Sequence, residues 1–162
     1  MKNCKISFEQ FFNSKTKTLY ESKDQDEIIK YHQRLLGNIL FVGELNRRGL
    51  LQESIILSVF DMLLCVDSVE TQMGFINDQT VEGAVVLMTK IGKLIDDKIN
   101  SIQGKIDSGT ALKGGEKVTL DKINRTFARF EELASETGQP QLSTRAKLLI
   151  KNMMDYRKAG WP

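Results

Sequence analysis

Positively charged side chains gather in the last third of this 162-residue sequence. They fall on two successive segments with helical spacing, so they could form one ridge that binds RNA phosphates or an acidic partner. The candidate RNA-binding residues are Arg125, Arg129, Arg145, Lys147 and Lys151, and Arg157 and Lys158 follow them. Glutamate and aspartate residues are interspersed among these cations, so an ordinary solubilising surface is the alternative interpretation.

The only tryptophan, Trp161, stands beyond the last segment of helical spacing, after Ala159 and Gly160. At that position it cannot be a core residue of the helix. Either it folds back and covers the end of the helical array, or it is exposed as an anchor for a binding partner. Tryptophan is enriched at the energetic centres of protein interfaces. The residues alone leave both alternatives open.

No group of residues in the sequence has the pattern of a catalytic or metal site. His32, the only histidine, lies inside a predicted helix with no cysteine or carboxylate placed to form a triad or a metal site with it. The stretch from Gly109 to Glu116 lacks the Lys-Ser/Thr pair of a phosphate-binding loop and follows a helix rather than a strand. We therefore predict that the protein is not an enzyme and that it holds no metal and no cofactor.

Two pairs of adjacent carboxylates also need an interpretation. They are Asp96 with Asp97 and Glu131 with Glu132. Adjacent side chains on a helix point about 100° apart, so neither pair can act together on one group. We interpret both pairs as parts of solvated helix faces.

The composition is that of one ordinary globular domain. Hydrophobic residues make up 41% of the chain and charged residues 27%, and a net charge of +2 does not by itself indicate a nucleic-acid-binding protein. Two cysteines, Cys4 and Cys65, have no evident reason to pair, which fits a reducing compartment. The sequence has no apolar signal-peptide core and no run of roughly 20 apolar residues. We expect a protein of the cytosol or nucleus without a membrane segment.

Apolar residues recur with helical spacing almost throughout, which predicts an all-α fold. After a short apolar segment around residues 6–12, a long helix should begin near Asp24 or Asp26 and end at Gly49. Further helices are expected over residues 52–66, from 77 or 78 to 95, over 98–106, from 119 to about 138, and from 143 or 144 onward, with a loop at 108–115. Short links between helices favour an α-solenoid of antiparallel pairs over a plain bundle.

Four collinear stretches resemble the middle domain of eukaryotic translation initiation factor 4 gamma. Residues 36–45 read Leu-Gly-Asn-Ile-Leu-Phe-Val-Gly-Glu-Leu, where the family has Leu-Gly-Asn-Ile-x-Phe-Ile-Gly-Glu-Leu. Residues 89–96 are similar to the family's Thr-x-Ile-Gly-x-x-Leu-Asp. Ser143, Arg145, Asp155 and Arg157 match residues of its last long helix, and residues 155–161 are similar to its Asp-Leu-Arg-x-x-x-Trp ending. The resemblance runs from about residue 4 to 162.

The resemblance implies a HEAT-repeat solenoid. Residues 1–162 would form a single partial domain of about three antiparallel helix pairs, the later repeats at the C-terminal part of the family's middle domain. Gly37 and Gly43 each cost roughly 1 kcal/mol inside a helix, so close contact between helices is the expected reason for both. The sequence Asn46-Arg47-Arg48 departs from the family's more apolar Phe-Lys-Leu.

The resemblance also implies a cytoplasmic scaffold of translation initiation. Such a scaffold binds a DEAD-box RNA helicase of the initiation factor 4A type, contacts messenger RNA, and acts with other initiation factors and the small ribosomal subunit. In the family the terminal tryptophan contacts the helicase, so we expect Trp161, with Arg157 and Lys158, to form the partner-binding end. The alternative is an RNA-binding helical-repeat adaptor of a related family that serves in nonsense-mediated decay, splicing or poly(A)-binding-protein interaction.

Overall fold

The computed structural model describes residues 25–66, 76–138 and 141–162, and within these ranges every regular element is a helix. The expected all-α class is therefore confirmed. The short apolar segment at residues 6–12, and Asp24, lie outside the described residues. The described helices are α2 (Gln25–Arg47), α3 (Glu53–Leu64), α5 (Asp78–Asp107), α6 (Glu116–Ala134) and α7 (Thr144–Lys158).

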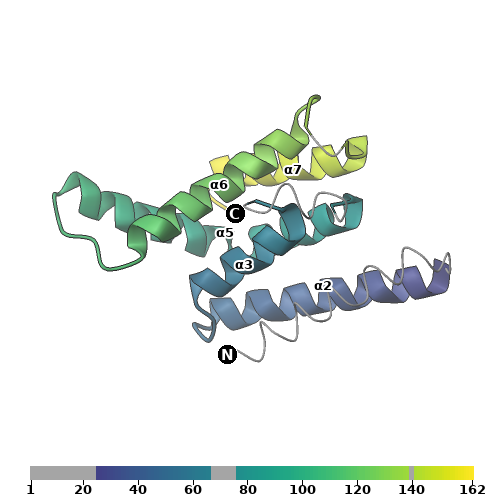
Figure 1. Cartoon of the computed structure of the whole chain (residues 1–162), viewed down its shortest axis with the longest axis horizontal. Helices are drawn as coiled ribbons and strands as arrows, with labels where there is room; N and C mark the ends of the chain where they lie inside the picture. Colours follow the sequence, from purple (N-terminus) through teal and green to yellow (C-terminus); the bar gives the residue numbers. More distant parts are fainter. Residues whose placement is uncertain (1–24, 67–75, 139–140) are drawn as a thin grey trace.

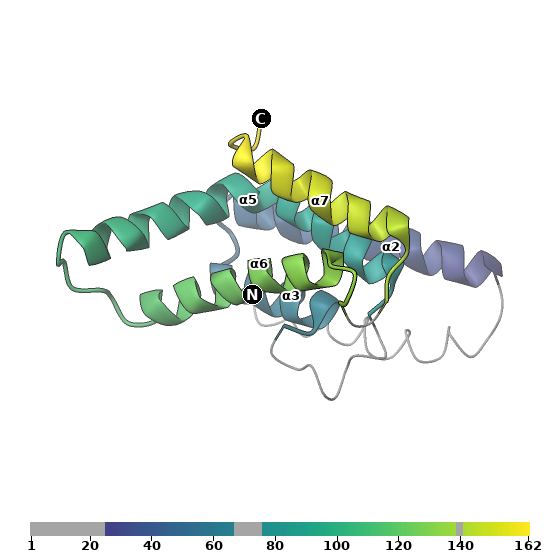
Figure 2. The same ribbon diagram turned by 90° about the horizontal axis from the view of Figure 1, so that it is seen from above.

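The helices form two layers (Figures 1 and 2). Helices α2, α5 and α7 run in one direction and lie side by side, while α3 and α6 run in the opposite direction in the second layer. Consecutive helices are thus antiparallel pairs, and each pair lies against the next, as expected of a helical repeat. Helix α5 contacts all four other helices. The superhelical geometry of a HEAT solenoid stays a prediction.

The sequence signals that begin and end the helices have the expected local geometry. Helix α2 ends at Arg47, and Gly49 in the turn that follows has a φ of +73°. The Leu50 N–H donates to the Leu45 carbonyl oxygen over 2.9 Å. The side chain of Asn77 accepts hydrogen bonds from the first turn of α5, and Ser143 does the same at the start of α7. These capping interactions determine the residues at which α5 and α7 begin and at which α2 ends.

The expected boundary between residues 95 and 98 is wrong, because α5 continues unbroken through both. Its buried face persists, with Ile95 and Ile102 both in the interior. Helix α6 begins at Glu116, before the expected Thr119. The Glu116 carboxylate accepts from the Lys113 N–H over 2.9 Å and from the Lys105 ammonium over 2.7 Å, which fixes the first turn.

The core lies between the two layers, where Phe60 of α3 and Phe130 of α6 meet edge to face at 6.2 Å between ring centroids. Gly43 is buried where α2 crosses α5, and a Cβ there would lie 3.0 Å from Cδ of Lys90. The close contact expected at Gly43 is confirmed. The one expected at Gly37 is wrong, since Gly37 is exposed with no described atom within 4 Å of its would-be Cβ. None of the described helices is long and apolar enough to cross a bilayer.

Candidate partner-binding site

The chain reverses direction directly after α7, and this turn places Trp161. Gly160 has a φ of +84° and Trp161 a φ of 58°. The Gly160 N–H donates to the Arg157 carbonyl over 2.9 Å, and the Trp161 N–H donates to the Tyr156 carbonyl over 3.0 Å. These bonds satisfy carbonyl groups at the end of the helix and direct the indole back toward α5.

A single carboxylate on α5, Asp96, fixes both the indole and the last turn of α7. Trp161 donates its Nε1–H to Oδ2 of Asp96 over 2.7 Å. Arg157 donates to the same carboxylate from Nε over 3.0 Å and from a terminal nitrogen over 2.8 Å. Charge-assisted bonds of this kind, with two nitrogens on one carboxylate, define orientation as well as adding energy.

Two further residues complete the packing around this carboxylate. Gly92 lies one turn before Asp96 on α5, and the ring of Trp161 occupies the space that a Cβ at Gly92 would need. The guanidinium carbon of Arg157 lies 3.6 Å from the centroid of the Phe127 ring on α6. Helices α5, α6 and α7 therefore all contribute to one site, which we call the Asp96 junction: Gly92, Asp96, Phe127, Arg157 and Trp161.

The structure shows the folded-back position for Trp161, with the ring packed on the core but still partly exposed. Lys158 is exposed beside Asp155, at 3.5 Å. Interpreting Asp96 as part of a solvated face was wrong, because its carboxylate is occupied by Arg157 and Trp161. Asp96 and Trp161 both belong to stretches that resemble the factor 4 gamma family. This was the signal in the sequence that could have indicated a role for Asp96 beside Trp161.

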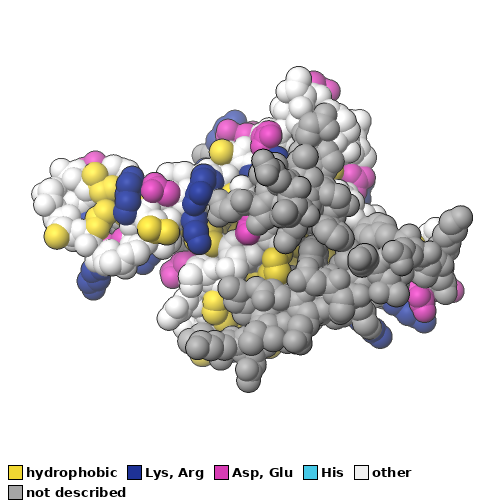
Figure 3. All heavy atoms as spheres, viewed as in Figure 1, with side chains coloured by type: hydrophobic (Ala, Val, Ile, Leu, Met, Phe, Trp, Pro, Cys, Tyr) yellow, Lys and Arg dark blue, Asp and Glu magenta, His cyan; other side chains and the backbone are white. Residues whose placement is uncertain are grey.

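The predicted RNA-binding cations are divided between α6 and α7. On the face shown in Figure 3, basic and acidic side chains are interspersed. Arg145 faces α5 and pairs with Glu82 over 3.2 Å. The ammonium of Lys147 lies 3.3 Å from the side-chain oxygen of Gln141, and its side chain is only 12% exposed. Both cations therefore already have polar partners within the chain.

Lys151 follows Lys147 by one turn of α7, whereas Arg125 lies on α6. Lys151 is exposed at the edge of a groove of about 500 Å³ between α6 and α7, which Glu131 and Asp155 also line. Arg125 is exposed on α6. Whether either residue contacts RNA stays a prediction.

Arg129 requires a correction, because it is only 5% exposed and cannot present its charge to a phosphate from this position. Its Nε donates to the Leu64 carbonyl over 2.9 Å, and a terminal nitrogen pairs with Glu132 over 2.8 Å. Leu64 is the last residue of α3, where carbonyl groups lack partners within the helix. Arg129 is therefore a buried residue that caps a neighbouring helix.

Two side chains of types that often act in catalysis lie close to the interior. Burial lowers the pKa of His32, whose Nδ1 has no hydrogen-bond partner among the described residues. Burial raises the pKa of the Cys65 thiol, which keeps it protonated and weakly nucleophilic. The described residues include no group of three or more His, Cys, Asp or Glu side chains that could hold a metal ion.

Comparisons with known proteins identify distant relatives. The chain matches no protein-family model, and no solved structure matches it. It is 24% identical over 164 residues to a von Willebrand factor A domain-containing protein of Dictyostelium discoideum, covering 98% of this chain. It is 23% identical over 141 residues to eukaryotic translation initiation factor 4G of Arabidopsis thaliana, covering 87% of this chain, and 26% identical over 133 residues to that of Cucumis melo, covering 82%.

The chain spans about 6% of the length of each of these three relatives. The similarity therefore concerns one segment of much longer proteins. That this segment corresponds to the middle domain of factor 4 gamma stays a prediction. Over most of its length, this chain is similar to a segment of proteins named eukaryotic translation initiation factor 4G.

Proposed function

We propose that this chain is a scaffold segment of translation initiation that has no catalytic activity of its own. The similarity to factor 4G of two plants, over 87% and 82% of the chain, supports this function. The pairwise stacking of helices supports it as well, because such arrays offer extended surfaces for partners. As the resemblance implies, it acts in the cytoplasm with other initiation factors and the small ribosomal subunit.

The proposed partner is a DEAD-box RNA helicase of the initiation factor 4A type, which docks at the Asp96 junction. The observation on which this proposal rests is the placement of Trp161. Its indole is fixed by a hydrogen bond to Asp96, yet part of the ring stays open to a partner. A pre-oriented aromatic side chain loses little conformational entropy on binding, which favours its use as an anchor. Arg157 holds the Asp96 carboxylate in place, and Lys158 is an exposed cation next to it.

The test is a titration of the helicase against the wild-type chain, Trp161→Ala and Phe41→Ala. Phe41 is the matched control, because it is an aromatic residue that is 58% exposed on α2. We expect Trp161→Ala to weaken binding by about tenfold or more, as the loss of an interface anchor does, and Phe41→Ala to leave it unchanged. Unfolding by urea shows whether each variant remains folded at the assay temperature.

Equal affinities and equal stimulation of the helicase ATPase for wild type and a folded Trp161→Ala would rule out Trp161 as the anchor.

Messenger RNA is the second proposed partner. With Arg129 buried, the proposed contacts are Arg125, Arg145, Lys147 and Lys151. RNA affinity that does not fall as salt rises would contradict these contacts, because phosphate binding releases counterions.

A further inference from the structure

One face of α5 lies outside the Asp96 junction and continues past the end of α2. Side chains spaced by four, four, three and four residues share a face of a helix. At this spacing α5 has the α5 stripe, which consists of Lys90, Leu94, Lys98, Ser101 and Lys105. Leu87 and Lys90 touch α2 at Gly43, whereas Gly92 and Asp96 hold Trp161. The stripe is therefore separate from the proposed helicase site.

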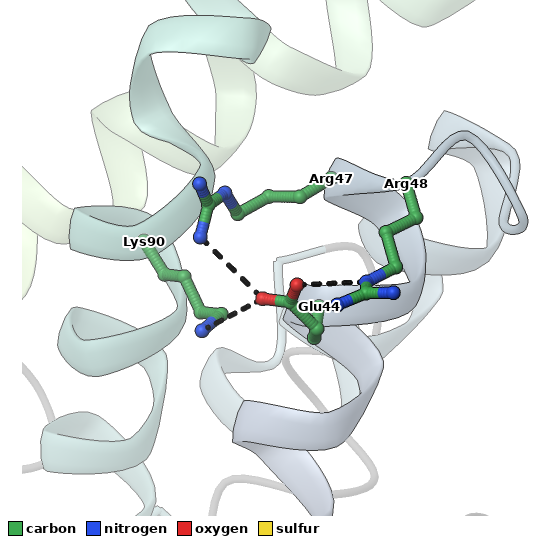
Figure 4. Close-up of polar contacts among 4 residues, drawn as sticks. All are labelled: Glu44, Arg47, Arg48 and Lys90. Carbon is green, nitrogen blue, oxygen red and sulfur yellow. Dashed lines mark hydrogen bonds and ion pairs between the residues drawn. The ribbon is translucent and has the colours of Figure 1, made fainter.

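The last turn of α2 adds positive charge at the start of the stripe (Figure 4). Three cations surround the carboxylate of Glu44, with nitrogen–oxygen distances of 3.4 Å to Arg47, 3.0 Å to Arg48 and 3.2 Å to Lys90. Lys90 reaches Glu44 by crossing directly over Gly43, where α2 has no Cβ. One carboxylate balances only one of the three cations, so the cluster has two positive charges in excess.

The stripe borders a groove of about 390 Å³ between α5 and the turn that joins α2 to α3. Arg47 and Asn46 line it on one side, and Leu94 and Lys98 line it on the other. Leu94 is 44% exposed, although it stands between two lysines. The groove thus combines an open apolar side chain with cations on both sides of it.

Two carboxyl groups, Glu44 and Glu116, bind cations at the two ends of the stripe. Hydrogen bonds from Arg48 and Lys90 lower the pKa of Glu44. A hydrogen bond from Lys105 lowers the pKa of Glu116, and the charge of Lys98 adds to this effect. These cations therefore stabilise negative charge at the two ends of the stripe.

The spacing of the stripe matches an extended peptide. Helical residues four apart are about 6 Å apart along the axis, so Leu94 lies about 6 Å from both Lys90 and Lys98. In an extended chain, alternate side chains point the same way and are about 6.6 Å apart. A segment with an acidic residue, any residue, an apolar residue, any residue and an acidic residue would therefore meet Lys90, Leu94 and Lys98 in order.

The surroundings favour a peptide over RNA. The described residues that line the groove include no aromatic side chain on which a base could stack. Glu53 and Asp97 also line it. The groove lining therefore has two carboxylates beside the two cations Arg47 and Lys98. A phosphate backbone has a negative charge at every nucleotide and would meet the carboxylates as well as the cations. A peptide can place its acidic side chains at the cations and its backbone N–H groups at the carboxylates, which accept hydrogen bonds.

We propose that the α5 stripe, together with Arg47 and Arg48, is a docking surface for an extended acidic segment of another protein, with the pattern acidic-x-apolar-x-acidic. The acidic residues pair with Arg47, Arg48 and Lys90 at one end and with Lys98 at the other. The apolar residue covers Leu94. This surface acts whether or not a helicase binds at Trp161.

The test measures binding of a fluorescein-labelled peptide in which Asp, Leu and Asp alternate with Ser. We expect Lys98→Glu and Leu94→Ser each to weaken binding about tenfold, the factor that corresponds to about 1.4 kcal/mol. Lys93→Glu is the matched control, since it makes the same charge reversal at an exposed position of α5 that lies off the stripe. We expect it to change the affinity by less than about twofold. If Lys98→Glu does not fold, Leu94→Ser tests the same groove without a change of charge.

Two outcomes would overturn the proposal. The first is equal affinity for a peptide of the same composition in which the two Asp residues are adjacent to each other and not to Leu. The second is a larger loss of affinity for single-stranded RNA than for the peptide in Lys98→Glu, which would identify the surface as a nucleic-acid site.

Discussion

At the scale of single residues, Asp96 has the most consequences for the proposed function. Its carboxylate is shared by an arginine and an indole that follow it in the sequence by 61 and 65 residues. It therefore joins the middle of α5 to the end of α7.

Asp96→Asn should lower the free energy of unfolding by about 1–3 kcal/mol, because Arg157 loses its charged partner in a partly buried site. Denaturation by urea measures the change. Asp97→Asn is the control, since it makes the same substitution at the next, exposed position, where an effect below about 0.5 kcal/mol is expected. Equal effects of the two substitutions would show that the pairing with Arg157 adds nothing.

Gly92→Ala should displace Trp161, because the added methyl group would occupy the space of the indole ring. Since Trp161 is the only tryptophan, its fluorescence emission reports the change directly, as a red shift caused by greater contact with water. Gly104→Ala on the same helix is the control, because no described atom lies within 4 Å of that Cβ position. It should leave the emission unchanged and stabilise the helix by up to about 1 kcal/mol. Unaltered emission from Gly92→Ala would contradict the packing described above.

At the scale of elements, the sequence predicted the helices better than it predicted their contacts. Caps at Asn77, Ser143 and Gly49 are local signals, and each was found at its expected place. The continuity of α5 was missed because helical spacing on either side of residue 97 does not show whether the two parts share one axis. The burial of Arg129 was missed because it depends on the end of α3, which lies 65 residues earlier in the chain.

Arg129→Ala should destabilise the protein by about 1–3 kcal/mol relative to wild type, because the Leu64 carbonyl loses its buried donor. Arg125→Ala on the exposed face of α6 is the matched control and should cost less than about 0.5 kcal/mol. Chemical denaturation distinguishes the two. If Arg129→Ala weakened RNA binding with no loss of stability, the capping role would be wrong. Arg129 would then be an RNA-binding residue, as the sequence predicted.

The contact of α2 with α5 through Glu44 predicts a dependence on pH. Cations lower the pKa of Glu44 in the folded protein below its ordinary value of 4.5. A lowered folded-state pKa stabilises the fold above the unfolded-state pKa, and this contribution disappears as the pH falls through the folded-state pKa. The difference in Tm between wild type and Glu44→Gln should therefore be present at pH 7 and decrease as the pH falls below 4.5. Glu53→Gln, with the same change of charge, is the control. A Tm difference for Glu44→Gln that does not decrease as the pH falls would exclude this ion-pair cluster as the cause.

At the scale of the whole molecule, α5 connects all the described helices. The Asp96 junction and the α5 stripe both depend on it, one through α7 and the other through α2. The existence of a helical array could be predicted from spacing, and the resemblance supplied the kind of partner. The position of Trp161 could not be predicted, because it results from contacts that only the folded array brings together.

Helix α5 touches every other described helix, so a substitution that destabilises α2 should also lower the urea concentration at which the region around Trp161 unfolds. Long repeat arrays can lose this cooperativity, which makes the prediction a test of the coupling. Ile39 of α2 is fully buried, so Ile39→Ala should cost about 2–5 kcal/mol. The neighbouring Phe41→Ala is the exposed control. Urea unfolding followed by Trp161 fluorescence and by far-ultraviolet circular dichroism should give one shared midpoint, lowered equally by Ile39→Ala. A lower dichroism midpoint with an unchanged fluorescence midpoint would mean that α2 unfolds independently of the Asp96 junction, and that α5 does not couple the two ends.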